Sequence, residues 1–172
     1  MRRSIFVALI VASLVLALAP AGARQFPMIT GGGHTQNNNS GGTPSEQTAF
    51  GGLVAQATGP ADGNGVYLAR GEIQVRSAGT DDRKTTAKIH GDVVCIMDRG
   101  ENIWEVRFQI ERAAPAALDA LEDGYASVFV RDGGRDDEAD ENFDPSLAAN
   151  PECGEADDYE MEPHQGQITV HA

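Results

Sequence analysis

The chain contains only two cysteines, Cys95 and Cys153, and they offer its clearest covalent chemistry. In an oxidising compartment, a pair of thiols in an exported chain tends to form a structural disulfide. A bridge between positions this far apart would stabilise the fold by restricting the unfolded chain. The alternative is that Cys95 is a small buried hydrophobic residue and that Cys153 lies in a mobile loop. We predict the Cys95–Cys153 bridge, which leaves neither thiol for catalysis.

A run of carboxylates after residue 131 could supply oxygen ligands to Ca²⁺, which accepts about six to eight of them. Read from its first aspartate, the run lacks both the glycine and the closing glutamate that an EF-hand loop requires. Like charges packed this closely are typical of a solvated segment. We therefore predict no specific metal site, and calcium binding that is weak or absent. The run comprises Asp132, Asp136, Asp137, Glu138, Asp140, Glu141 and Asp144.

The four histidines, His34, His90, His164 and His171, have no spacing typical of zinc ligands. His90 and His171 fall on the polar sides of predicted strands, so they could share a surface patch. The sequence contains no nucleophile elbow, phosphate-binding loop, dinucleotide fingerprint or metalloprotease histidine pair. It therefore indicates no catalytic residue and no cofactor.

The first 23 residues have the three parts of a secretory signal peptide. Two arginines follow the initial methionine, an apolar run covers residues 5–19, and a small-residue motif, Ala-Gly-Ala, ends at Ala23. The run is shorter than the roughly 20 apolar residues that cross a bilayer. We expect a protein that is secreted or held in the cell envelope, with no stable membrane insertion after the signal is cleaved.

The formal net charge of the chain is −13, and loss of the two signal arginines makes the mature protein more acidic still. Such a charge repels the phosphates of nucleic acids and of anionic lipid surfaces. We therefore expect no nucleic-acid partner, and the sequence identifies no other partner. The same charge would attract cations or basic proteins, although its simplest effect is to keep the protein soluble.

Alternation of apolar and polar residues predicts β-strands in the mature chain. In the clearest strand, Trp104, Val106, Phe108 and Ile110 are expected to face a core, while Glu105, Arg107, Gln109 and Glu111 are expected to face water. The preceding strand, at residues 85–97, is expected to place Ala87, Ile89, Val93, Cys95 and Met97 on one side. Residues 98–102, Asp-Arg-Gly-Glu-Asn, have the composition of a hairpin turn between the two strands.

Weaker strands are predicted at residues 49–57, 66–76, 125–131 and 167–171, and a short helical connector at residues 113–122. Because long helices between strands are missing, the pattern favours an all-β fold, a small antiparallel barrel or sandwich of about six strands. Apolar residues are scarce in two segments, residues 30–46 before the first predicted strand and residues 132–164 before the last one. We expect a signal peptide (1–23), a flexible polar leader (24–46) and one β-domain (47–172) with a mobile acidic loop (133–164).

Five short phrases occur in order along the mature chain: Gly31-Gly32-Gly33, Phe50-Gly51, the segment from Ile89 to Cys95, the segment from Val130 to Gly134, and the segment from Gly166 to His171. Together they resemble a group of small exported bacterial β-domains, the post-COAP-1-like secreted domains, for which no activity is known. The resemblance implies a compact antiparallel β-fold and assigns no activity to the chain.

For function, the sequence favours a non-enzymatic exported module with a structural or ligand-binding role. One alternative is a small β-barrel enzyme that uses carboxylates and His90, since any such group within hydrogen-bond reach can act as acid or base. The other is a calcium-responsive binding module. A barrel filled by Trp104 and its apolar neighbours would favour the module, whereas a cavity lined by convergent polar side chains would favour the enzyme.

The signal peptide leads to a prediction about the mature protein. Cleavage after Ala23 should leave Arg24 as the first residue, because signal peptidase requires the small residues at 21 and 23. N-terminal sequencing of secreted protein tests this expectation. Exported material that still begins at Met1 would contradict it.

Overall fold

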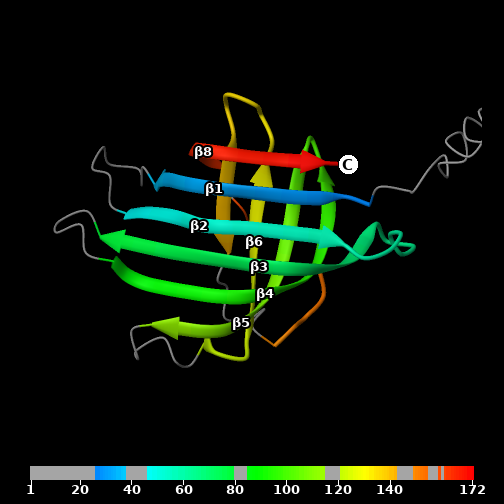
Figure 1. Cartoon of the computed structure of the whole chain (residues 1–172), viewed down its shortest axis with the longest axis horizontal. Coiled ribbons are helices and arrows are strands. Elements are labelled where there is room, and N and C mark those ends of the chain that lie inside the picture. Colours follow the sequence, from blue (N-terminus) through cyan, green and yellow to red (C-terminus); the bar gives the residue numbers. More distant parts are fainter. Residues whose placement is uncertain are drawn as a thin grey trace, which may run out of the picture.

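The computed structural model describes residues 26–37, 46–79, 85–114, 121–142, 149–154, 159 and 161–172. Within these ranges the antiparallel strands follow one another in sequence order around a closed barrel (Figure 1). No helix in this part of the chain is long and apolar enough to span a membrane. The strands are β1 (Met28–Asn37), β2 (Glu46–Ala57), β3 (Val66–Gly79), β4 (Thr85–Gly100), β5 (Ile103–Ala114), β6 (Tyr125–Arg131), β7 (Glu138–Asn142) and β8 (Glu162–His171).

The barrel is flattened into two layers. Strands β8, β1, β2 and β3 run side by side across the front in Figure 1, and β6 crosses behind them at a steep angle. The space between the layers is filled by apolar side chains, including all four that the alternation in β5 predicts for the core. These four are Trp104, Val106, Phe108 and Ile110.

Strand β4 takes part in both layers because bulges bend it. The register with β5 shifts between His90 and Gly91 and again between Val93 and Cys95. A side chain at position 91 would meet the carbonyl oxygen of Gln109 at 2.4 Å, so this close approach to β5 requires glycine. The second bulge also changes which residues face inward. Val93 and Ile96 both lie in the core.

The predicted hairpin between β4 and β5 is present. Its two turn residues, Glu101 and Asn102, have φ angles of 53° and 61°, as a tight turn that follows the strand twist requires. The Asp98 carboxylate accepts a hydrogen bond from the backbone N–H of Gly100 at 2.8 Å. The local composition of residues 98–102 therefore accounts for the turn.

The described residues form eight strands, more than the expected six or so. One additional strand, β1, lies inside the expected flexible leader, and the other, β7, lies inside the expected acidic loop. Strand β1 is ordered by backbone pairing with both β2 and β8 and by the complete burial of Ile29. A search for large apolar residues misses such a strand, because its neighbours supply most of the stabilising contacts.

The predicted connector at residues 113–122 is not a helix where the structure describes it. Ala113 and Ala114 end β5, and only a single turn follows at residues 121–123. Residues 115–120 lie outside the described part of the chain. The strand predicted at residues 167–171 is present as part of β8, which pairs with β1 along residues 164–171.

Two aspartates of the acidic run help to close the barrel. The β7–β8 ladder has only two paired positions, Glu138 with Pro163 and Ala139 with Glu162. Beyond it, Asp137 accepts a hydrogen bond from the backbone N–H of Ile168 at 2.7 Å, and Asp132 accepts one from the N–H of Val170 at 3.0 Å. The two carboxylates thus replace ladder bonds that β7 is too short to make.

Asp137 is the more deeply placed of the two closing carboxylates. It is 3% exposed, and its second oxygen accepts a hydrogen bond from the N–H of Gly133 at 2.9 Å. Its burial contradicts the expectation of a mobile loop throughout residues 133–164. Aspartate suits this position because its short side chain offers two acceptor oxygens, one for each backbone N–H group.

Replacement of Asp137 by alanine should therefore destabilise the barrel. The variant leaves two backbone N–H groups without an acceptor, and the expected loss is about 2–4 kcal/mol in the free energy of unfolding. Urea denaturation of the purified protein measures this loss. Asp136→Ala is the matched control, because Asp136 is exposed and its removal should change stability by less than about 0.5 kcal/mol. Equal stability of the two variants would contradict the proposed closure.

Candidate functional site: the strap groove

A segment from the expected acidic loop lies across the outside of the barrel. We call residues 149–154 the strap. The structure joins Cys153 of the strap to Cys95 of β4 in the predicted disulfide, with Cα atoms 6.1 Å apart. Both cysteines are buried, and neither is free. The strap is thus fixed covalently to the outer face of the sheet.

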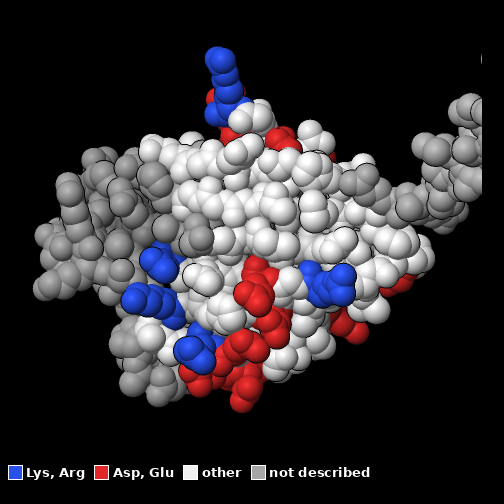
Figure 2. Space-filling view, viewed as in Figure 1, with Lys and Arg blue, Asp and Glu red and all other residues white. Residues whose placement is uncertain are grey.

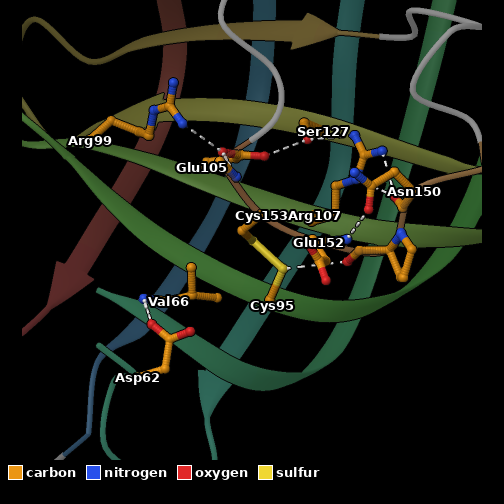
Figure 3. The surroundings of a disulfide bond; sticks show 12 residues. Asp62, Val66, Cys95, Arg99, Glu105, Arg107, Ser127, Asn150, Glu152 and Cys153 are labelled. Carbon is orange, nitrogen blue, oxygen red and sulfur yellow. Dashed lines mark hydrogen bonds and ion pairs between the residues drawn. A yellow bond between two sulfur atoms is a disulfide. The ribbon is translucent and has the colours of Figure 1, made fainter. Parts of the chain in front are cut away.

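Beneath the strap, side chains of β5 and β6 form a buried polar network, which we call the outer polar cluster (Figure 3). Glu105 and Ser127 are 0% exposed and Arg107 is 1% exposed. The Ser127 hydroxyl donates to one oxygen of Glu105 at 2.9 Å and accepts from Arg107 at 3.0 Å. The second oxygen of Glu105 faces the guanidinium of Arg99 at 3.4 Å.

The outer polar cluster also holds the strap at both ends. Arg107 donates two hydrogen bonds to the backbone carbonyl of Asn150, at 3.1 and 2.7 Å. The N–H of Gly154 donates to Glu105 at 2.9 Å. Charged groups without such partners would be costly to bury. The cluster therefore has a structural role that accounts for all three of its buried members.

This arrangement corrects two expectations drawn from the strand pattern. Glu105 and Arg107 were expected in water, but the strap covers the outer face of β5 and buries them. Cys95 was expected beside Val93 on the core side, but the bulge after Val93 reverses the alternation. Cys95 now pairs in register with Arg107, and directly opposed residues in an antiparallel ladder share a face. Cys95 therefore points outward, toward the strap.

A second, apolar contact covers the neighbouring part of β6. The rings of Phe129 and Tyr159 are stacked with their centroids 4.3 Å apart, and Tyr159 and Met161 pack against the buried pair Ile103 and Phe129. The sequence gives one signal for this contact. In Tyr125–Arg131 no charged residue alternates with the core residues, which indicates that both faces of the strand are covered.

A groove of about 590 Å³ lies between the strap and the outer surface of β3 and β4. Its apolar lining includes Leu68, which is 73% exposed and is the most exposed large hydrophobic residue in the described part of the chain. The disulfide and residues 151–154 line it on the strap side, and the loop before β3 contributes Asp62 and Asn64. The remaining lining residues are Val66, Val94 and Met97.

The shape of the groove is fixed by bonds on both sides. On the loop side, Asp62 accepts hydrogen bonds from the N–H groups of Asn64 at 2.8 Å and Val66 at 2.9 Å. On the strap side, the disulfide and the outer polar cluster hold Cys153 and Gly154 (Figure 3). The volume falls in the range of about 300–1,000 Å³ that is common for ligand pockets. The groove is therefore a preformed candidate binding site.

The residues considered for metal binding and catalysis are not brought together. Among the described residues, no group of three or more His, Cys, Asp or Glu side chains could hold a metal ion. Asp132 and Asp137 bind backbone N–H groups of β8, and Asp136 is exposed. The side chains of Asp140 and Glu141, and the whole of Asp144, lie outside the described part of the structure.

The histidines are also dispersed. His90 on β4 lies between two carboxylates of neighbouring strands, with Glu111 at 3.2 Å and Glu72 at 3.7 Å. His171 is exposed on β8. Because β1, β2 and β3 lie between β8 and β4 in the barrel, His171 and His90 do not share a surface patch. His34 and His164 belong to the paired strands β1 and β8, where only the backbone is described.

Charges of both signs are mixed on the barrel face shown in Figure 2, below a broad area over β1 and β2 that carries few charges. On the outer surface of the sheet, Arg70, Glu72 and Asp92 line one shallow hollow, and Arg76, Lys88 and Arg112 line another. Like charges lie directly opposite each other on β3 and β4, Glu72 with Asp92 and Arg76 with Lys88. The face therefore carries both signs, with the acidic pair at one hollow and the basic pair at the other.

Comparison with known proteins adds no assignment. No protein-family model, curated protein or solved structure matches the chain. The resemblance to post-COAP-1-like secreted domains therefore stays a prediction.

The disulfide should account for a large share of the stability. It closes a loop across 58 residues, and Cys95→Ala with Cys153→Ala should lower the free energy of unfolding by about 4 kcal/mol on the chain-entropy estimate. Urea denaturation of both single variants and the double variant measures this effect. Each single variant should lose nearly as much as the double variant, because either substitution removes the bridge. Losses that simply add would show two independent buried side chains instead.

Proposed function

We propose that this protein is an exported, non-enzymatic binding module and that the strap groove is its ligand site. The observation that carries the proposal is the exposed apolar lining of the groove. Leu68 is 73% exposed within a cavity that a disulfide and several hydrogen bonds hold open. When a ligand covers an apolar side chain in a preformed concave site, the burial of apolar surface makes the free energy of binding more favourable.

The filled barrel supports a binding role outside the barrel. Trp104, Phe108 and Val128 occupy the space between the two layers together with the rest of the core. Small barrels of this kind hold side chains where larger barrels hold a ligand. The buried polar groups of the outer polar cluster are engaged with one another and with the strap, so they are supports of the fold rather than reacting groups.

Export supports the proposal from the sequence side. The N-terminal signal pattern and the disulfide both suit an oxidising compartment outside the cytoplasm. The net charge of −13 disfavours nucleic acids and anionic lipids as ligands. A protein or small-molecule ligand in the envelope or the medium is the remaining class.

Binding of a neutral apolar dye, Nile red, tests the groove without knowledge of the natural ligand. The exported protein should bind the dye, and Leu68→Asp should weaken binding by about tenfold or more, because it removes apolar contact area and adds a charge that must be desolvated. Fluorescence titration measures the affinity, and circular dichroism checks that the variant is folded.

Val54→Asp is the matched control for this measurement. Val54 is the other large hydrophobic residue that is exposed in the described part of the chain, at 50%, and it lies on β2 outside the strap groove. The control should leave dye affinity unchanged. Absence of dye binding, or equal losses in the two variants, would show that the groove is not the apolar binding site.

A further inference from the structure

The rim of the strap groove carries charge of one sign. Its described lining residues include two charged side chains, Asp62 and Glu152, and both are carboxylates. Both residues are exposed. The groove therefore combines an apolar surface with an acidic rim, in contrast to the mixed charges on the face in Figure 2.

The two carboxylates come from separate segments. The hydrogen bonds that the Asp62 carboxylate accepts from Asn64 and Val66 end on the same oxygen, Oδ1, and Oδ2 is the atom that would face a ligand. Glu152 belongs to the strap, and its backbone N–H donates to the side chain of Asn150 at 2.8 Å. The Asp62 carboxylate and the backbone of Glu152 are thus positioned before a ligand arrives, which lowers the entropic cost of binding.

Arg99 lies close to Gly154 of the strap, and its guanidinium faces the buried carboxylate of Glu105. That ion pair is part of the outer polar cluster beneath the strap. Asp62 and Glu152 are exposed, so their carboxylates present charge to solvent beside the apolar lining.

We propose that the strap groove binds a peptide segment of a partner protein in which an apolar side chain neighbours lysine or arginine. This inference rests on the proposed function and adds the class of ligand. The apolar side chain would cover Leu68, and the cations would pair with the two rim carboxylates. Because the carboxylates come from two separate segments, an extended peptide with a cation on each side of the apolar residue engages both, whereas one small cation engages one. The net charge of −13 draws basic segments toward the protein and repels acidic ones.

Three labelled peptides test the inference: Ser-Lys-Leu-Lys-Ser, Ser-Gln-Leu-Gln-Ser and Ser-Glu-Leu-Glu-Ser, each blocked at both ends. Fluorescence polarisation with the exported protein at low salt should give about tenfold tighter binding of the lysine peptide than of the glutamine peptide, the order expected for two partly exposed ion pairs. The preference should shrink as salt is raised, since salt screens exposed charges. The glutamate peptide should bind most weakly.

Charge-neutral variants of the rim decide whether the groove causes this preference. Asp62→Asn with Glu152→Gln should abolish the preference for the lysine peptide, and the loop should keep its fold because asparagine keeps an acceptor for the loop hydrogen bonds. Circular dichroism checks that the variant is folded. Asp136→Asn with Glu122→Gln removes the same charge at exposed positions outside the groove lining and should keep the preference.

The two proposals fail in different ways. No preference among the peptides, together with dye binding that Leu68→Asp removes, overturns the ligand class and leaves the groove as an apolar site. A preference that survives the rim substitutions also overturns the inference, because it would then arise from the overall charge of the protein. Loss of dye binding itself overturns the proposed function.

Discussion

The outward direction of Cys95 depends on one extra residue in β4, and much of the candidate site depends on Cys95. Without the register shift between Val93 and Cys95, strict alternation would point the thiol into the barrel, where Cys153 could not reach it. With the bulge, Ile96 enters the core and the thiol meets the strap. The disulfide, the cover over β5 and the wall of the groove all follow from this local change of direction.

The strap supplies hydrogen-bond partners for two charged residues on the outer face of β5. Glu105 and Arg107 lie on the outer face, and burying either alone would be unfavourable. Each finds partners on both the sheet and the strap: Ser127 links the two side chains, and the backbone groups of Asn150 and Gly154 complete the network. The polar network therefore sets where the strap can lie, while the disulfide limits how far it can move away. The groove keeps its shape because both constraints act on the same short segment.

The acidic composition has at least two separate uses within the described structure. Asp132 and Asp137 accept backbone hydrogen bonds where the β7–β8 ladder is too short to close the barrel. Other carboxylates stay at the surface, and at the groove they stand beside apolar side chains. A filled barrel with its concave site on the outer wall is suited to display of a binding surface, and that geometry is the basis of our proposal of a binding module.

The sequence by itself determined the features that depend on local periodicity and turn chemistry. The strands from β2 to β6, the turn at Glu101 and Asn102, and the inward set on β5 all follow from alternation or from residues that tolerate positive φ. The disulfide partners followed from the cysteine count alone. These predictions need only neighbouring residues or a choice between very few pairs.

Only the tertiary structure decided the features that arise from contacts distant along the chain. Strand β1 is ordered by hydrogen bonds to two other strands, and no pattern of its own residues reveals them. The burial of Glu105 and Arg107 depends on a strap that follows them by more than 40 residues. The groove exists because a bulge in β4 directs one thiol outward toward that strap. Alternation specifies which residues share a face of a strand, but the segment that comes to cover that face is set by the folding of the whole chain.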